Sequence, residues 1–342
     1  MFDKLLGNDQ IKEAILRMIA KDRFPHSALF VGEKGVGKKL FALEIARTFL
    51  CQNPNNFQAC EVCSSCKRIG VFSFPTSDKK DDFDKVFLSE HLDVGQIISF
   101  KRNISVAAIR ELEREANFRP YEGKARFFII NDADKMNDAA ANALLKTLEE
   151  PSPTTYIFLI TSRPMSLLQT IRSRCQTIRF APIEAKKIEK FLLEKNTYSI
   201  VDAQLLSRLS AGSIGRALSL DLVNFRTQRD RMISVLEGIL NRKLSVVLQV
   251  SEQLGDAKLK EEYEIHLEIL QTLIHDLWTI QIGGNNIINV DLTAKFESLA
   301  NITHPKRLGL WLSEIETVRE NLAINLNKKI ATDALFVIMA NG

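Results

Sequence analysis

The sequence predicts an α/β protein: a doubly wound parallel sheet in the N-terminal half, followed by an all-helical C-terminal part. Three observations lead to this fold class. A phosphate-loop pattern follows the first apolar strand, strands then alternate with helices as far as residue 180, and only helical periodicity remains from Pro182 onward. At 342 residues, the chain is long enough for about two or three domains.

Composition and charge narrow the class of protein. Hydrophobic residues make up 45% of the chain and charged residues 26%, which is typical of a globular protein. A formal net charge of +4 allows contact with nucleic acid but does not require it. No apolar run approaches the length of a membrane span, and the N-terminus lacks a signal-peptide pattern. The sequence therefore predicts a cytoplasmic protein.

The first elements lead into the phosphate loop. A helix capped by Asn8 is expected first, then a strand at Ala28–Val31, a Gly-x-x-x-x-Gly-Lys loop over 32–38 and a helix at Leu40–Leu50. Gly32, Gly35 and Gly37 would let backbone N–H groups close around an anion, and Lys38 would reach its outer phosphates. The Ser or Thr that normally follows this lysine and binds Mg²⁺ is Lys39 here, whose ammonium group cannot bind a metal.

Four cysteines follow the loop helix with the spacing C-x8-C-x2-C-x2-C: Cys51, Cys60, Cys63 and Cys66. Four thiolates with two tight x2 knuckles favour a closed, structural Zn²⁺ site in a module too small to have its own core. An iron–sulfur cluster and a set of free thiols are the alternatives.

The rest of the N-terminal half follows a strand–helix alternation. Residues 70–103 are harder to interpret, and residues 78–82 are expected to form a solvated loop. Strands are expected at 86–88, 126–130, 156–160 and 177–180, and helices at 104–118 and 139–150, with another ending at 171–175.

Beyond Pro182 the sequence predicts helices alone. Apolar positions around 188–192 and 205–209 mark two of them, and a Gly-Ser-Ile-Gly break follows at 212–215. A stripe at helical spacing, typical of a core or a subunit interface, comprises Leu270, Leu273, Ile274, Leu277 and Trp278.

Several motifs in this order resemble the AAA+ clamp-loader family of bacterial replication. The matching pieces are the 32–38 loop, the cysteine knuckles, Pro-Tyr-Glu-Gly at 120–123, the run from Asn142 to Pro151, and Ser-Arg-Cys at 173–175. The resemblance covers nearly the whole chain. Several motifs in the correct order are far more specific than a lone phosphate loop.

The resemblance implies a domain plan. An AAA+ nucleotide-binding-like domain would span 1–180, with the zinc module at about 51–66. A three-helix lid would span 181–222, and a helical collar for oligomerisation 223–342. The role of residues 76–103 stays open.

The departures from the family argue against an ATPase motor. In motor subunits (gamma/tau) the strand before the magnesium site ends in Asp-Glu, whereas this chain has Asn131 and Asp132 there. If Asp132 instead takes the metal position, Ala133 stands in place of the glutamate. The arginine that senses the γ-phosphate from the lid is replaced by Gly215. Phosphoryl transfer depends on positioning and electrostatics, so we expect no intrinsic ATPase. Binding of ATP or ADP remains open, and Thr161 or Ser162 occupies the polar sensor position.

What the chain retains is an arginine at the family's trans-acting motif. Arg174 would reach the ATP of a neighbouring subunit, because a guanidinium is always charged and can bind the γ-phosphate with two N–H groups. A surface salt bridge is the alternative role for Arg174, and Arg172 is the weaker candidate for the finger.

These inferences favour a non-hydrolysing stator subunit of the DNA polymerase III clamp loader. The resemblance implies gamma/tau and delta subunits, the sliding clamp and primed DNA as partners. Arg102, Arg110 and Arg114 are candidates for DNA contact. The alternative function is an active gamma/tau-like motor or another AAA+ ATPase that remodels DNA.

Overall fold

The structure, a computed structural model, describes residues 2–101, 103–255, 260–321 and 327–341. It divides into two compact units: residues 1–188 with 211–216, and residues 189–210 with 217–342. The first contains the sheet, and the elements described in the second are helices. Across the described ranges, no helix is long and apolar enough to cross a bilayer. The predicted division at 180 and 222 stays a prediction.

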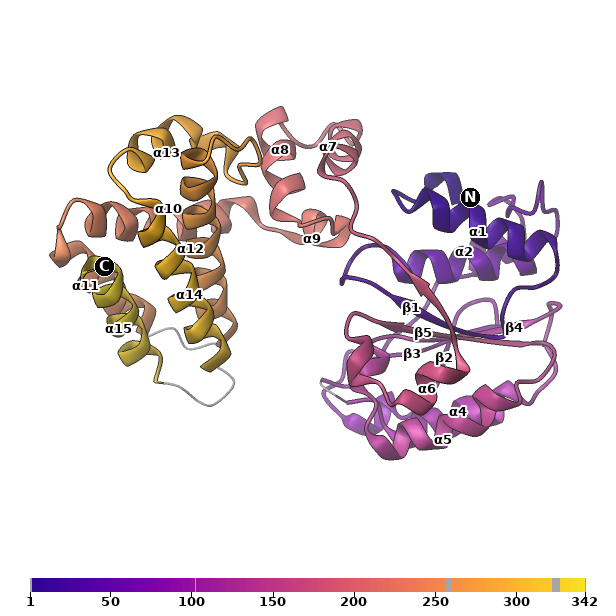
Figure 1. The fold of residues 1–342 in the computed structure, drawn as a ribbon. Coiled ribbons are helices and arrows are strands. Elements are labelled where there is room, and N and C mark those ends of the chain that lie inside the picture. The colour runs from indigo at the N-terminus through magenta and orange to yellow at the C-terminus, as the bar shows by residue number, and fades with distance from the viewer. Residues whose placement is uncertain (1, 102, 256–259, 322–326, 342) are drawn as a thin grey trace. The chain divides into compact units, whose positions relative to one another are not determined.

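Within the described residues, six strands form one sheet in the order β2-β3-β4-β5-β1-β6 (Figure 1). All neighbouring strands are parallel except the edge pair β2 and β3, which confirms the predicted α/β sheet. Because β1 lies beside β5 and β4 comes next, the loops after these three strands meet at the carboxyl edge. The strands are β1 (Ser27–Val31), β2 (Phe87–Leu88), β3 (Val94–Ile97), β4 (Arg126–Ile130), β5 (Thr155–Thr161) and β6 (Gln176–Arg179).

The central strands are apolar on both faces, and successive side chains alternate between two cores. In β4, Phe127 and Ile129 join one cluster, whereas Phe128 and Ile130 join the other. Such continuous apolar runs are what a parallel sheet covered on both faces requires. This packing explains why these strands were predictable from sequence.

Helices cover both faces of the sheet (Figure 1). One face carries α1 (Asp9–Ala20) and α2 (Lys38–Leu50), and the other carries α4 (Val106–Ala116), α5 (Asp138–Glu149) and α6 (Gln169–Arg174). The short α3 (Ser64–Arg68) belongs to the cysteine segment. The 3-10 turns of this unit are Phe2–Lys4, Lys80–Phe83, Ala133–Lys135 and Pro164–Ser166, and the second of these falls in the segment expected to be a solvated loop.

Asn8 occupies the expected N-cap position of α1, but the prediction that it caps the helix is wrong. It has a left-handed backbone (φ 53°), and its side chain makes no capping hydrogen bond. Its Oδ1 instead accepts from the Ala181 backbone N–H at 2.8 Å, and its Nδ2 donates to the Ala181 carbonyl at 3.2 Å. The side chain therefore ties the start of α1 to the segment just after β6, a long-range contact that the local pattern does not reveal.

The sequence did not predict β3, which lies between β2 and β4. Its residues Gly95 and Gln96 are poor strand formers, but both are buried. A Cβ on Gly95 would lie 2.6 Å from a Val86 methyl and 2.9 Å from the Phe128 ring, so the close packing of the sheet requires glycine there. Tertiary packing, not propensity, makes this segment a strand.

In the second unit, helices α8 and α10 to α15 pack around one hydrophobic cluster. The predicted stripe on α12 is buried at Leu270, Leu273, Ile274 and Leu277, but Trp278 is 39% exposed and lies outside this core. The helices are α7 (Ala185–Glu194), α8 (Ile200–Leu209), α9 (Ile214–Ser219), α10 (Leu222–Leu240), α11 (Leu244–Gly255), α12 (Lys260–Gln281), α13 (Thr293–Ala300), α14 (Pro305–Asn321) and α15 (Lys328–Asn341); the first and third also extend into the sheet unit, and a 3-10 turn spans Val290–Leu292.

Candidate functional site

The phosphate loop links β1 to α2 at the carboxyl edge of the sheet. Gly35 and Gly37 have left-handed backbones (φ 82° and 99°), a conformation that favours glycine. A Cβ on Gly32 would lie 2.5 Å from the Phe180 carbonyl oxygen, so the loop also needs glycine where it passes β6. The backbone has therefore kept the shape that the sequence pattern predicts.

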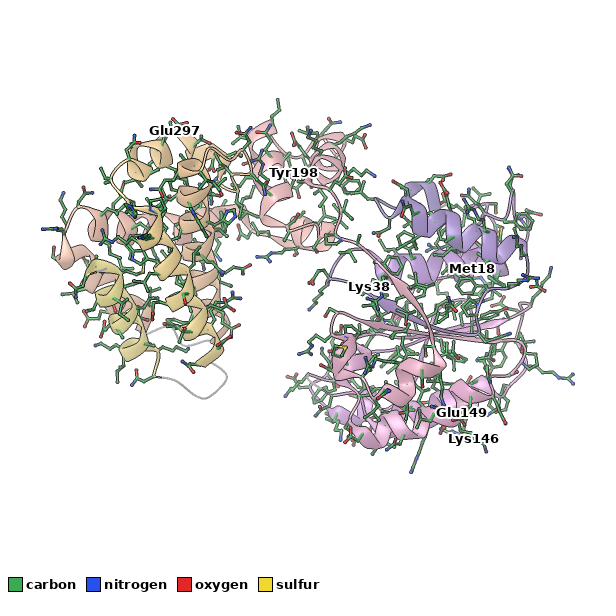
Figure 2. All side chains as sticks on the ribbon, viewed as in Figure 1. Met18, Lys38, Lys146, Glu149, Tyr198 and Glu297 are labelled. Atoms are coloured by element: carbon green, nitrogen blue, oxygen red, sulfur yellow. The ribbon has the colours of Figure 1, made fainter. Side chains whose placement is uncertain are left out.

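Lys38 is folded back onto this loop. It is 6% exposed, and its ammonium donates to the carbonyl oxygens of Gly32 at 2.5 Å and Glu33 at 2.7 Å. Burial lowers the pKa of Lys38, and the negative charges of Glu33, Asp132 and Asp134 counter this only in part. Two of its three N–H donors are thus used by the loop itself. Figure 2 labels Lys38 at this edge of the sheet.

The Lys39 side chain lies against two aromatic rings. Its ammonium is 5.6 Å from the centre of the Phe72 ring and 5.7 Å from that of Phe74. Burial lowers the pKa of Lys39. The side chain in the position of the magnesium hydroxyl therefore packs on the segment after α3 through a cation–π contact.

The Gly-Ser-Ile-Gly break at 212–215 packs on the phosphate loop. The Gly215 N–H donates to the Gly35 carbonyl at 2.9 Å. A Cβ on Gly215 would lie 3.0 Å from the Gly35 Cα and 3.2 Å from its carbonyl oxygen. The residue in the place of the family's sensor arginine is thus a glycine that allows two backbones to touch.

Polar groups at the carboxyl ends of β4 and β5 bind one another. The Thr161 hydroxyl donates to Asp134 at 2.6 Å, and Arg163 donates to the other oxygen of Asp134 at 3.0 and 2.7 Å. Burial tends to raise the pKa of Asp134, but these hydrogen bonds outweigh it, so that the pKa of Asp134 is below its ordinary value. Asp132 has a left-handed backbone and pairs with Lys135 at 2.9 Å. The candidate sensor and metal residues therefore have protein partners.

The four clustered cysteines converge, and their sulfur atoms all lie within 4.8 Å of one another. Zn–S bonds of about 2.3 Å in a tetrahedron place sulfurs about 3.8 Å apart, so the set has the donors and spacing for a structural metal such as zinc. Burial tends to raise the pKa of Cys63, but N–H groups of Cys66 and Gln52 outweigh it and lower the pKa to about 6. Burial raises the pKa of Cys66 well above its usual range.

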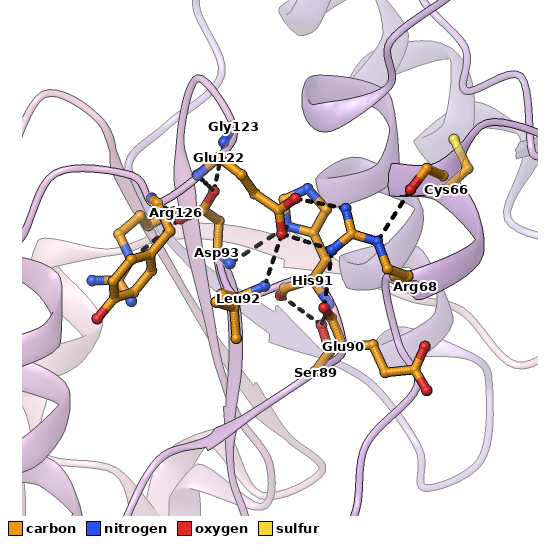
Figure 3. Close-up of polar contacts among 12 residues, drawn as sticks. Cys66, Arg68, Ser89, Glu90, His91, Leu92, Asp93, Glu122, Gly123 and Arg126 are labelled. Carbon is orange, nitrogen blue, oxygen red and sulfur yellow. Dashed lines mark hydrogen bonds and ion pairs between the residues drawn. The ribbon is translucent and has the colours of Figure 1, made fainter.

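The cysteine segment is tied to the sheet by a network that sequence reasoning missed (Figure 3). Arg68, the last residue of α3, donates to both oxygens of Glu122 at 2.9 and 2.6 Å. The fully buried Asp93 accepts from the backbone N–H groups of residues 121, 122 and 123 at 2.6–3.0 Å. The Pro-Tyr-Glu-Gly motif at 120–123 was visible as a family signature, but its hydrogen-bonding role was not.

Arg174 ends α6 and is about one-third exposed at its side chain. Its Nε donates to Glu149 at 2.6 Å, and its Nη1 donates to the Thr170 carbonyl at 3.0 Å. The predicted alternative, a surface salt bridge, is therefore present in this chain. It does not exclude a second partner, because a guanidinium has five N–H donors.

Basic side chains on α4 and α5 line an open groove of about 1040 Å³. Arg110 and Arg114 come from α4, and Lys146 comes from α5. Glu113 and Glu150 also line this groove, which makes its charge mixed. The third arginine considered for DNA contact, Arg102, lies outside the described residues.

Two family models match this chain. The family model described as "DNA polymerase III, delta subunit" matches residues 7–184, and the one described as "DNA polymerase III, delta subunit, C terminal" matches residues 224–336.

Curated relatives extend the match to nearly the full chain. The DNA polymerase III subunit delta′ of Bacillus subtilis is 30% identical, covering 97% of this chain and 96% of the relative. The subunit delta′ of Escherichia coli is 31% identical, covering 95% and 92%. The gamma/tau subunit of Mycoplasma genitalium is 28% identical, but only 56% of its length is covered. The chain belongs to the delta′ family of DNA polymerase III clamp-loader subunits.

Proposed function

We propose that this chain is a non-hydrolysing stator of the clamp loader, which donates Arg174 to the ATP site of a neighbouring motor subunit. One observation carries the proposal. The finger arginine is partly exposed with N–H donors to spare, while the lysine of the chain's own phosphate loop is buried against that loop's carbonyls. The chain would therefore complete another subunit's site and have no working site of its own.

The groups that ATP hydrolysis would need are missing or otherwise engaged. Lys39 contributes no hydroxyl for Mg²⁺, Asn131 contributes no carboxylate, and Gly215 contributes no guanidinium. Without them, a bound nucleotide would lack metal coordination and charge stabilisation in the transition state. Binding of ATP or ADP at the loop without turnover is compatible with this proposal, with Gly32, Gly35, Gly37, Lys38, Lys39, Asp132 and Thr161 around it.

Membership of the delta′ family supports the choice of partners. We place the chain in a ring with gamma/tau and delta subunits, in the bacterial cytoplasm, where the assembly opens the sliding clamp and loads it onto primed DNA. Residues 223–342 would join the collar of that ring, and residues 181–222 would form the lid.

Arg110, Arg114 and Lys146 on the outer helices of the sheet support a contact with the DNA backbone in the assembled ring. Each phosphate contact that is lost should reduce the dependence of binding on salt by about one unit of log–log slope. Replacing Arg110 and Arg114 with glutamine, then titrating primed duplex with the loader at several salt concentrations, tests this. An unchanged slope contradicts the contact.

We further assign Zn²⁺ to the Cys51, Cys60, Cys63 and Cys66 cluster, in a structural role. All four donors come from the protein, so no coordination position remains for a reacting water. The ion pair between Arg68 and Glu122 would then fix the segment before β4 to the metal-bound module.

The test separates the stator from a motor. The isolated chain should hydrolyse no ATP in Mg²⁺. In the assembled loader, single-turnover phosphate release from the neighbouring site should slow by roughly 10³-fold with Arg174→Ala. The matched control is Arg172→Ala, two residues earlier in α6, which should leave the rate of phosphate release unchanged. Brisk hydrolysis by the chain alone would support the motor alternative, and slowing by Arg172→Ala but not Arg174→Ala would reassign the finger.

A further inference from the structure

The guanidinium of Arg174 is held on one side by the protein. Its Nε donates to Glu149 Oε1 at 2.6 Å, and its Nη2 forms an ion pair with the same oxygen. Its Nη1 donates to the Thr170 carbonyl at 3.0 Å. Figure 2 labels Glu149 near the end of α5, on the face of the sheet that α5 and α6 cover. The last residue of α5 and the first turn of α6, the helix that carries Arg174, therefore both contact this guanidinium.

The contacts leave a specific part of the guanidinium available. Of its five N–H donors, one on Nε, one on Nη1 and one on Nη2 are engaged. One N–H remains on each terminal nitrogen. A pair of N–H donors on the two terminal nitrogens is the kind of fork with which arginine binds two oxygens of a phosphate at once.

The backbone next to Arg174 is also held in place by packing. The next residue, Cys175, is 8% exposed and belongs to the hydrophobic cluster under α5 and α6. The side chain of a free arginine has many rotamers, and ordering them on binding costs free energy. A guanidinium already held by Glu149 and Thr170 avoids part of that cost when phosphate arrives.

We infer that Glu149 is a positioning residue for Arg174. It binds the Nε edge of the guanidinium and leaves the terminal fork pointed at a phosphoryl group of a nucleoside triphosphate held by another subunit. This inference rests on the proposed finger role of Arg174. It adds a residue to that role whose function neither the motif nor the family match reveals.

The carboxylate can do this without competing strongly with phosphate. The Glu149 side chain is 47% exposed and that of Arg174 is 33% exposed, so solvent screens their attraction. A phosphate with more negative charge can bind the remaining fork while the Nε edge stays in place. Glu149 therefore orients the arginine without trapping it.

The experiment uses the assembled loader with Glu149→Gln, Arg174→Ala and the double variant, and measures single-turnover phosphate release over a range of ATP concentrations. Glu149→Gln should slow the part of phosphate release that is lost in Arg174→Ala by about 10-fold. The ATP concentration that gives the half-maximal rate should stay unchanged within twofold. In the Arg174→Ala background, Glu149→Gln should cause no further slowing, because Glu149 acts only through Arg174.

The matched control is Glu13→Gln, which removes the carboxylate partner of another exposed arginine, Arg17, at 3.0 Å. It should leave phosphate release unchanged. Thermal unfolding and subunit assembly should be the same for both glutamine variants, since both side chains are exposed.

The outcomes separate the two proposals. If Arg174→Ala leaves phosphate release unchanged, the finger role and the positioning role both fail. If Arg174→Ala slows it but Glu149→Gln does not, the finger stands and positioning by Glu149 is wrong. Equal slowing by Glu149→Gln with and without Arg174 would also overturn the positioning role, because the effect would then not pass through the arginine.

Discussion

The phosphate loop and the cysteine knuckle are joined by α2, and they have kept different properties. The loop has its backbone shape, but Lys38 donates to the loop's own carbonyls and Lys39 packs on aromatic rings. In the knuckle, all four sulfurs converge within 4.8 Å. In this chain the four sulfurs of the knuckle face one another, whereas the two lysines of the loop contact other parts of the protein. The comparison shows that the backbone shape of a motif and the contacts of its functional side chains are separate properties, each of which must be established from structure.

Metal removal should have the largest effect, because it should destabilise the knuckle and leave the phosphate loop folded. Because a closed cysteine site contributes its metal-binding energy to folding, about 10 kcal/mol in small zinc modules, chelation should unfold the knuckle. Amide hydrogen exchange should show lost protection in residues 60–68, while β1 and the phosphate loop remain protected. Unchanged protection in the knuckle would contradict a structural metal.

The fifth cysteine provides the control for this prediction. Cys63→Ser should abolish metal binding, measured as metal content per chain, whereas Cys175→Ala should retain about one equivalent. Cys175 is buried outside the cluster, and burial raises the pKa of its thiol to about 12. Loss of metal in both variants would indicate general unfolding rather than loss of a ligand.

A methyl group at Gly215 should have a smaller effect, confined to the loop. In Gly215→Ala, the Cβ would lie 3.0 Å from Gly35 Cα, so one backbone must move, at a cost of about 1–3 kcal/mol. The melting temperature of the sheet unit should fall by several degrees, and metal content should not change.

Gly309→Ala is the matched control for that substitution. Gly309 lies in α14 with no atom within 4 Å of its would-be Cβ, so alanine should stabilise the helical unit by about 0.5–1 kcal/mol. If Gly215→Ala were stabilising as well, the 212–215 segment would not pack on the loop as described.

The smallest expected effect concerns Asp134, whose carboxylate accepts a hydrogen bond from the Thr161 hydroxyl. Its folded-state pKa lies below the ordinary value of 3.8, so its ionised form stabilises the fold above that pH, and this stability is lost as the pH falls further. In Asp134→Asn, this decrease in the free energy of unfolding at acidic pH should be absent. The difference from the unsubstituted chain should be about 0.5–1 kcal/mol.

Urea unfolding between pH 7 and pH 3 measures this difference. Asp78→Asn, in an exposed loop, is the control and should follow the unsubstituted chain. A parallel pH profile for Asp134→Asn would mean that the contacts with Thr161 and Arg163 do not form in solution.

Local patterns were sufficient for much of this molecule. The strand before the loop, the buried strand at 126–130 and the cysteine spacing were predictable, because each depends on residues that are close together in the chain. The same holds for the family motifs, whose order carried the resemblance to the clamp-loader family. The departures at Lys39, Asn131 and Gly215 were equally visible from sequence.

Other features depend on segments that are far apart in the chain. No local pattern shows that Asn8 binds Ala181 instead of capping α1, or that β3 forms between β2 and β4. The Arg68–Glu122 pair and the buried carboxylate of Asp93 likewise join residues about 30 to 54 positions apart. Such contacts arise only when the sheet brings these segments together.

The sequence by itself determined which chemical groups this protein has: a glycine loop without a metal hydroxyl, four thiols at knuckle spacing and an arginine at the finger motif. Tertiary structure alone decided what those groups bind. It turned Lys38 onto its own loop, placed Gly215 against Gly35 and set Glu149 beside Arg174. The physical reason is range: residue type and spacing are local properties, whereas the partner of a side chain depends on how distant segments pack.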